Sequence, residues 1–175
     1  MSKMNGIDVN MLGSLAEKYK KNPEDAITNF ASTVKWKDGF YSEAEVGDYK
    51  PVPIDEPEWL SGTGKGPNPV ELLLSALGAC VGVGFIATAS GMGIKVNSLD
   101  VDVTGEIDLN VFFGLKEGNS GFDEINVRFN VDSDADEAQV EKLIAKAIEI
   151  SPVRNTIERN VKVTSMYTLH KTMNT

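Results

Sequence analysis

The chain has 175 residues and a formal charge of −9, from 17 Lys and Arg against 26 Asp and Glu. This acidity argues against a broad basic patch for nucleic acid or an acidic membrane surface. Apolar residues make up 41% of the chain, which is typical of a globular domain. The single cysteine, Cys80, excludes an intramolecular disulfide, and the single histidine, His170, cannot build a zinc site alone. We therefore expect no metal and no cofactor.

The first part of the chain is predicted to contain a helix and then a small sheet. Residues 8–21 place apolar side chains near one face of a helix, which ends at an Asn-Pro break. We assign residues 1–28 to an N-terminal helical extension and residues 29–175 to the main domain. Within residues 29–54, short strand-like runs separated by glycine-containing turns predict two or three antiparallel strands. The N-terminus lacks the apolar core of a secretory signal, which favours a cytoplasmic protein.

A long uncharged helix is predicted over residues 68–91. Asn68, followed by a proline and by Glu71 at the third helical position, forms a capping-box pattern. No charged residue occurs from Leu72 to Ile94, a length that could also span a membrane. Because glycines and serines dilute its apolar content, and because the downstream sequence alternates like a soluble sheet, we expect a helix buried on nearly all sides.

The glycines inside this helix suggest how it is packed. An interior glycine costs about 1 kcal/mol relative to alanine, so it is tolerated where another backbone approaches closely. Gly78 and Gly82 therefore predict a second helix crossing at this point. A chain of this size has few elements long enough to enclose the helix. We expect a homodimer in which two such helices lie side by side.

The remaining elements follow from alternation and capping patterns. Residues 99–109 and 125–131 alternate as two half-buried strands. Asp134 with Glu137 predicts a second capping box, followed by an amphipathic helix. Ser151 with the proline after it predicts the start of a short helical turn. The last predicted strand carries Val161, Val163 and Leu169.

Three motifs invite a functional interpretation that their sequences do not support well. The glycine-rich residues 62–66 suggest anion capture but lack the P-loop ending, so a positioned loop or a lid over a pocket is expected. Residues 132–136 imitate an EF-hand loop, which fails at Glu137 and Leu143, and we expect helix capping instead. His170 has no visible partner and is expected to be structural or solvent-facing.

Cys80 is the residue with the clearest chemical potential. A cysteine in the middle of an apolar helix is usually a small buried hydrophobic residue. The helix dipole cannot activate Cys80, because the residue lies about three turns from the N-terminus and the effect fades within one turn. A reactive thiolate would need a cation from another segment or another chain.

Two blocks of sequence resemble a known family. Residues 66–80, Gly-Pro-Asn-Pro-Val-Glu-Leu-Leu-Leu-Ser-Ala-Leu-Gly-Ala-Cys, precede residues 151–156, Ser-Pro-Val-Arg-Asn-Thr. Together they resemble the OsmC/Ohr family of osmotically induced and organic hydroperoxide resistance proteins, over residues 30–169. The resemblance implies an α+β fold, in which antiparallel sheets wrap the two long central helices of an intertwined homodimer.

The resemblance also implies a set of site residues. In the peroxidase members, a thiolate on the central helix attacks the hydroperoxide, an Arg and a Glu stabilise the site, and a second Cys resolves the sulfenic acid. Cys80 matches the attacking position and Ser151 the resolving one. Val70 stands at the position of the Glu, with Glu71 next to it. Arg154, beside the second motif, is a further candidate. No Arg occurs in residues 29–54, where the available cations are Lys35, Lys37 and Lys50.

These observations lead to two functional hypotheses of different classes and to a third alternative. In the first, Cys80 reduces organic hydroperoxides and an external thiol restores it, because the serine at position 151 cannot form a disulfide. In the second, the chain is a non-catalytic module that binds a small lipophilic ligand at the dimer interface. The absence of the Arg and of the second Cys favours the binding module, whereas the presence of Cys80 favours the enzyme. A purely structural or stress-associated dimer is the third.

Overall fold

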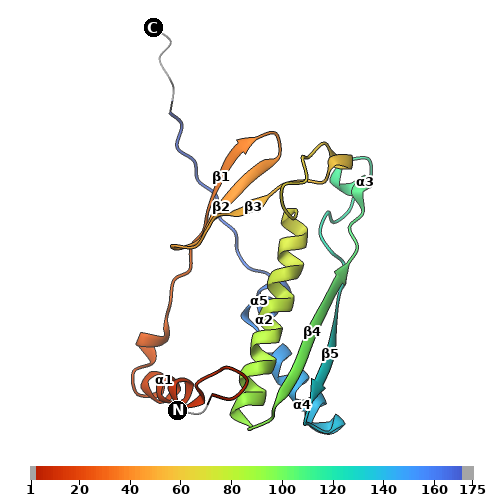
Figure 1. The fold of residues 1–175 in the computed structure, drawn as a ribbon. Coiled ribbons are helices and arrows are strands. Elements are labelled where there is room, and N and C mark those ends of the chain that lie inside the picture. Colours follow the sequence, from red (N-terminus) through yellow and green to blue (C-terminus); the bar gives the residue numbers. More distant parts are fainter. Residues whose placement is uncertain (1–2, 171–175) are drawn as a thin grey trace.

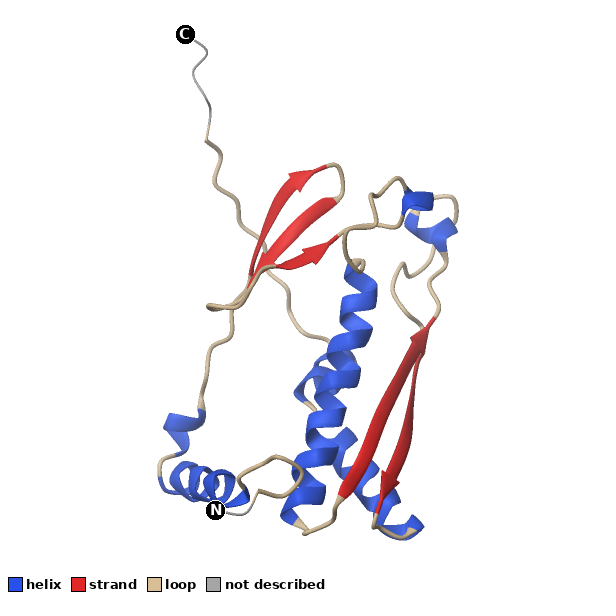
Figure 2. Ribbon diagram, viewed as in Figure 1, coloured by secondary structure: helices blue, strands red, loops and turns tan. Residues whose placement is uncertain are grey.

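The computed structural model describes residues 3–170, which form an α+β fold (Figure 1). A long helix, α2 (Pro69–Gly91), runs through the middle of the molecule, with a three-stranded antiparallel sheet near its N-terminal end. A two-stranded antiparallel ribbon of β4 (Val96–Gly105) and β5 (Ile125–Ser133) lies along its length (Figure 2). The α+β class predicted from the sequence is confirmed.

The start of α2 is specified by the predicted capping box. The Asn68 side chain accepts from the Glu71 amide at 2.9 Å, and the Glu71 carboxylate accepts from the Asn68 amide at 2.8 Å. These two bonds satisfy backbone donors that a helix start otherwise leaves free. After Gly91 the chain turns into β4 through Gly93, whose φ of +72° is readily adopted only by glycine.

The hydrophobic core lies where α2 meets the ribbon and a second long helix. Helix α4 (Glu137–Ile150) and the short helix α5 (Pro152–Ile157) pack against α2, and β4 packs against another part of its surface. The fully buried residues of this core cluster are Phe85 and Ala89 of α2 with Leu143 and Ala147 of α4. Phe129 and Val131 of β5 cover this cluster. Alternate residues of β5 face inward, as the alternation predicted.

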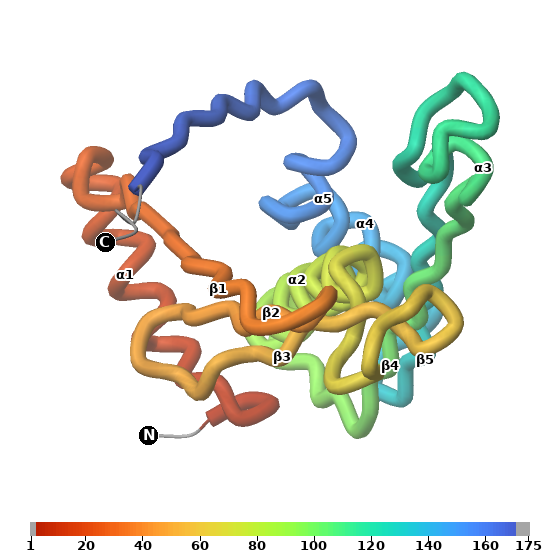
Figure 3. Tube along the Cα trace, turned by 90° about the horizontal axis from the view of Figure 1, so that it is seen from above, coloured from red at the N-terminus to blue at the C-terminus, as the bar shows by residue number. Residues whose placement is uncertain are grey.

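The N-terminal sheet is paired within itself but leaves much apolar surface open. It consists of β1 (Thr33–Asp38), β2 (Tyr41–Glu45) and β3 (Val52–Ile54), in the order β1-β2-β3. Val34 and Trp36 of β1 are 59% and 71% exposed. Figure 3, which views the molecule from above, shows this sheet extending away from α2 on the side opposite the ribbon. The sheet therefore has an apolar face that the described part of the chain does not cover.

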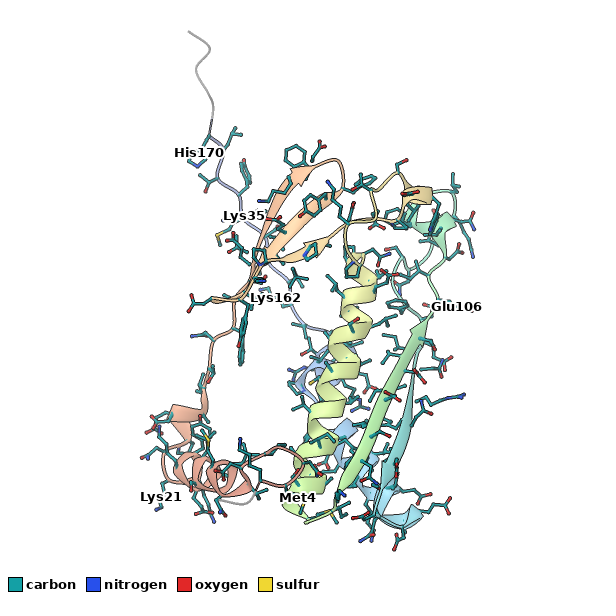
Figure 4. The ribbon with its side chains drawn as sticks, in the orientation of Figure 1. Met4, Lys21, Lys35, Glu106, Lys162 and His170 are labelled. Carbon is teal, nitrogen blue, oxygen red and sulfur yellow. The ribbon has the colours of Figure 1, made fainter. Side chains whose placement is uncertain are left out.

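The N-terminal extension contains the predicted helix and an anchor that the sequence did not reveal. Helix α1 (Val9–Lys21) and a 3-10 turn (Pro23–Ala26) contain no buried residue. Just before them, Asn5 donates to the Ser90 hydroxyl and to the Ile94 carbonyl, and it accepts from the Val96 amide. Figure 4 shows Met4 beside the C-terminal end of α2. The extension is thereby fastened to the domain at the junction of α2 and β4.

Among residues 3–170 no helix crosses α2 at Gly78 and Gly82, where the sequence predicted a close helix approach. A Cβ at Gly78 would lie 3.0 Å from Val103 of β4, and one at Gly82 would lie 3.8 Å from Val101. Both glycines face the ribbon. The close helix approach occurs at Gly84, where a Cβ would lie 3.2 Å from the Cα of Ala147 in α4.

Helix α2 is not buried on nearly all sides within one chain, which corrects the expectation from its uncharged sequence. One face is covered by the ribbon and by α4, but Val83 is 70% exposed and Leu73 is 40% exposed. At 100° per residue these two side chains lie on one stripe with Cys80. The absence of charge therefore reflects an open apolar stripe as well as a core.

Two local predictions are also corrected. The second capping box is formed by Asp136 and Gln139 rather than by Asp134 and Glu137. No strand is formed by residues 158–170, the described part of the chain that follows α5, where a last strand was predicted. In Figures 1 and 3 this segment leaves α5 and runs toward β1. Its alternating apolar residues have no paired strand to bury them, and Val163 and Tyr167 are exposed.

Candidate functional site

Cys80 lies at the edge of the open stripe of α2. Its side chain is half-buried. Leu77 and Gly84, which lie on one flank of Cys80, are buried beneath α5 and α4, whereas Val83 on the other flank is exposed. The helix rotation of 100° per residue accounts for this intermediate setting. A thiol placed in this way is packed on one side and accessible on the other.

The structure brings Cys80 and Ser151 into direct contact. The Ser151 hydroxyl donates a hydrogen bond to the Cys80 sulfur, with an O–S distance of 3.1 Å. Ser151 is the N-cap of α5, and its Oγ accepts from the Arg154 amide at 3.2 Å. The side chain is 1% exposed. Two candidates separated by 71 positions are therefore neighbours, because α5 packs against the middle of α2.

Arg154 belongs to this neighbourhood, but its charge is directed elsewhere. Its guanidinium forms an ion pair with Glu158 one turn later, at 2.5 Å. Its Nε is buried and has no hydrogen-bond partner within the described residues. The connection to Cys80 runs through the Arg154 backbone amide and Ser151 rather than through the guanidinium. Arg154 thus supports the helix start that positions Ser151.

Glu71 is not brought to Cys80. Nine residues of α-helix separate them, which corresponds to about 13 Å along the axis and to opposite faces. The Glu71 carboxylate accepts from the Asn68 amide as part of the capping box. Glu71 and Ser75 line a hollow against β4, away from the open stripe. The geometry therefore gives Glu71 a structural role within this chain.

The candidate lysines of the N-terminal sheet are paired with acidic residues on the neighbouring strand. Lys35 binds Glu45 at 2.7 Å, and Lys37 binds Glu43 at 2.8 Å. The hydrogen bond from Lys37, joined by one from the Tyr41 hydroxyl, holds the pKa of Glu43 below its ordinary value. Figure 4 places Lys35 on the sheet, beyond the N-terminal end of α2. Lys50 is exposed in the turn before β3.

The glycine-rich loop does capture an anion, and that anion is the side chain of Asp55. This carboxylate, 1% exposed, accepts from the amides of Glu56, Thr63 and Lys65 and from the Thr63 hydroxyl. The Thr63 hydroxyl is the main cause that holds the pKa of Asp55 below its ordinary value. The loop is tight, because a Cβ at Gly62 would overlap the Glu56 backbone. Sequence reasoning missed Asp55, although an acidic residue preceding the loop was a usable signal.

A cavity of about 490 Å³ lies among α2, β5, α4 and α5. Its apolar wall includes Leu77 of α2, Ile125 of β5 and Ile157 of α5, and Arg154 lies at its polar side. Neither Cys80 nor Ser151 lines it. Among residues 3–170, no group of three His, Cys, Asp or Glu side chains could hold a metal ion. His170 lies on the exposed segment after α5 (Figure 4).

The chain belongs to the OsmC-like protein family. A model of that family, described as OsmC-like protein, matches residues 62–166, which is more than half of the chain. The match includes Cys80, Ser151 and the elements that bring them together. No curated protein sequence matches the chain.

Solved structures share the fold. An OsmC-like protein from Mycoplasma pneumoniae is 25% identical, with a TM-score of 0.65 over 75% of this chain and 88% of that chain. The organic hydroperoxide resistance protein OsmC from Legionella pneumophila is 20% identical, with a TM-score of 0.55 over 75% and 92%. OhrB of Bacillus subtilis is 22% identical, with a TM-score of 0.51 over 75% and 93%. At these lower identities the likeness is one of fold.

The fold also explains the membrane-like character of α2. By length and composition α2 could cross a membrane. Its packing against β4 and α4, in a fold shared with OsmC-like proteins, makes it a core helix, which is consistent with a soluble protein.

Proposed function

We propose that this OsmC-like protein reduces organic hydroperoxides through Cys80, with an external thiol as the reductant. The observation that carries the proposal is the 3.1 Å contact between the Cys80 sulfur and Ser151, at the two positions where the family resemblance places the attacking and resolving residues. The names of two structural neighbours, organic hydroperoxide resistance proteins, support the same chemistry.

The reaction is a one-cysteine cycle. The Cys80 thiolate attacks the terminal oxygen of the hydroperoxide, the O–O bond breaks, and the alkoxide leaves as an alcohol after taking a proton from solvent. Cys80 is oxidised to sulfenic acid. One external thiol then forms a mixed disulfide with release of water, and a second thiol regenerates Cys80 as the external disulfide departs. A cytoplasmic location suits this cycle, because thiols are kept reduced there.

A homodimer forms part of the proposal. The open stripe of α2 carries Leu73 and Val83, and the uncovered face of the N-terminal sheet carries Val34 and Trp36. Exposed apolar side chains gathered on one face of an element are typical of an association site. A second copy that covers both surfaces would enclose Cys80 and would bring the partner's strands, with their lysines, to the sulfur.

The test is consumption of cumene hydroperoxide with dithiothreitol or a monothiol as reductant. Wild type should consume the peroxide, and Cys80→Ser should not. The matched control is Ser75→Ala, a change on the ribbon-facing side of the same helix. Equal consumption by wild type and Cys80→Ser would rule out the peroxidase function.

Binding without turnover is the second candidate, and one observation favours it. The guanidinium of Arg154 and the ammonium groups of Lys35 and Lys37 are each engaged by a carboxylate of the same chain. A thiolate at Cys80 would need an unpaired cation nearby, whereas binding of a small lipophilic ligand at the dimer interface would not. Fluorescence titration with an apolar dye such as 1-anilinonaphthalene-8-sulfonate, on wild type and on Cys80→Ser, separates this role, since both proteins should then bind equally and consume no peroxide.

A further inference from the structure

The hydrogen-bonding capacity of Ser151 is directed at the sulfur. A serine hydroxyl has one donor proton and two acceptor lone pairs. The Arg154 amide donates to Oγ at 3.2 Å, as the N-cap bond of α5. The side chain is 1% exposed, which leaves little access for water. The single donor proton of the hydroxyl goes to the Cys80 sulfur at 3.1 Å.

We propose that Ser151 is a catalytic partner of Cys80, whose hydroxyl stabilises negative charge on the sulfur. This proposal rests on the proposed role of Cys80 as the nucleophile. A hydrogen bond to an ionised acceptor is roughly twice as strong as one between neutral groups, so the donor favours the thiolate over the thiol. The dipole of α2 acts only near its ends, and Cys80 lies in the middle of that helix.

The arrangement gives one residue two linked tasks. The N-cap bond fixes Oγ at the start of α5, and that position aims the hydroxyl proton at Cys80. A donor held by the backbone in this way needs no reorganisation when charge develops on the sulfur. A serine hydroxyl cannot form a disulfide, so Ser151 does not become linked to Cys80 when the sulfur is oxidised. The sulfenic acid at Cys80 is therefore reduced by the external thiol.

The test is the rate of Cys80 alkylation by iodoacetamide between pH 6 and 9, which requires no peroxide. Ser151→Gly removes the donor but keeps most of the capping effect, since glycine at an N-cap costs only a few tenths of a kcal/mol. Its alkylation at pH 7 should be about tenfold slower than in wild type, the loss expected for one charge-assisted hydrogen bond. Ser151→Thr, which keeps a hydroxyl, should restore the rate.

The control for helix capping is Asp136→Ala, which removes the N-cap of α4 and does not touch Cys80. It should alkylate at the wild-type rate. If Ser151→Gly also does so, or if Asp136→Ala slows equally, the assignment of Ser151 is wrong. Failure of the proposed function is distinguishable. If wild type consumes no hydroperoxide while Ser151→Gly still slows alkylation, the peroxidase proposal fails and the action of Ser151 on the thiolate stands.

Discussion

The Asp55 carboxylate accepts hydrogen bonds from both the amide and the hydroxyl of Thr63, at 3.0 and 2.5 Å. A third bond comes from the Lys65 amide at 3.2 Å. These bonds close the loop that joins the N-terminal sheet to α2 and deliver Asn68 to its capping position. The same bonds occupy the loop amides that an external phosphate would need. The loop therefore positions the sheet rather than binding a nucleotide.

This relationship predicts how stability depends on pH. The pKa of Asp55 is held below its ordinary value, so its stabilising effect is present above the unfolded-state pKa and is lost as pH falls through the folded-state pKa. Asp55→Asn should lower the melting temperature at pH 7 by several degrees. The difference from wild type should shrink below about pH 4. Thermal unfolding followed by circular dichroism, with the exposed Asp48→Asn as control, tests this; a pH-independent difference would contradict it.

The Asn5 anchor should contribute measurably to the stability of the C-terminal end of α2. Its φ of +50° is one that glycine adopts freely, so Asn5→Gly removes only the side-chain hydrogen bonds. We expect a loss of about 1–3 kcal/mol, because the Val96 amide is left without its acceptor. Hydrogen exchange at Val96 should become faster. Asn5→Asp keeps the acceptor for the Val96 amide but loses the donor to the Ile94 carbonyl, so exchange at Val96 should remain slower than in Asn5→Gly. Unchanged exchange in Asn5→Gly would argue against the anchor.

Gly84 should tolerate substitution worse than another glycine of the same helix. A side chain there meets the Ala147 backbone at 3.2 and 3.3 Å, so Gly84→Val should destabilise by about 1–3 kcal/mol through overpacking. Gly91→Ala meets nothing within 4 Å and should stabilise by about 0.4–1 kcal/mol. Urea unfolding measures both. A Gly84→Val protein as stable as wild type would show that α4 can move away at little cost.

Ser151→Cys should convert the site into a dithiol. The oxygen of Ser151 lies 3.1 Å from the sulfur of Cys80, so a short adjustment brings two sulfurs to bonding distance. After one equivalent of hydroperoxide, both thiols should disappear together in a thiol titration, and dithiothreitol should restore both. The Cys80→Ser, Ser151→Cys double variant provides the control, since it should keep its thiol. Two free thiols remaining after peroxide would mean that the backbones prevent the bond.

The open stripe of α2 predicts the effect of a charge at Val83. This side chain is 70% exposed in one chain, and the proposed dimer would bury it. Val83→Glu should therefore shift the protein to monomer at micromolar concentration, since an unpaired buried carboxylate is strongly unfavourable. Leu115→Glu, 76% exposed on the loop after α3 (Leu109–Phe112), should leave the mass unchanged. A wild-type monomer in analytical ultracentrifugation would overturn the dimer proposal.

Local signals in the sequence predicted most elements of the fold. The start of α2 was predictable because Asn68 and Glu71 cap it through bonds between near neighbours. The partners of Gly84 were not, because periodicity does not say which element approaches a given face. The same limit applies to the final strand, since alternation in residues 158–170 indicates a strand without supplying the strand that pairs with it.

The site was predictable to different degrees. The resemblance placed Cys80 and Ser151 at two family positions, and their contact depends on how α5 packs against α2. Asp55 was missed because its partners lie on a loop whose closed shape cannot be read from glycine content alone. Asn5 was missed because its partners are 85 to 91 positions away.

That separation has a consequence for how the chain is made. Asn5 leaves the ribosome well before Ser90, Ile94 and Val96, which emerge only after the whole of α2 has been synthesised. Contacts between residues so far apart in sequence form slowly relative to local ones. The hydrogen bonds of Asn5 can therefore form only late, after the chain has been synthesised through the junction of α2 and β4. In a nascent chain arrested before Val96, the segment around Asn5 should be open to protease.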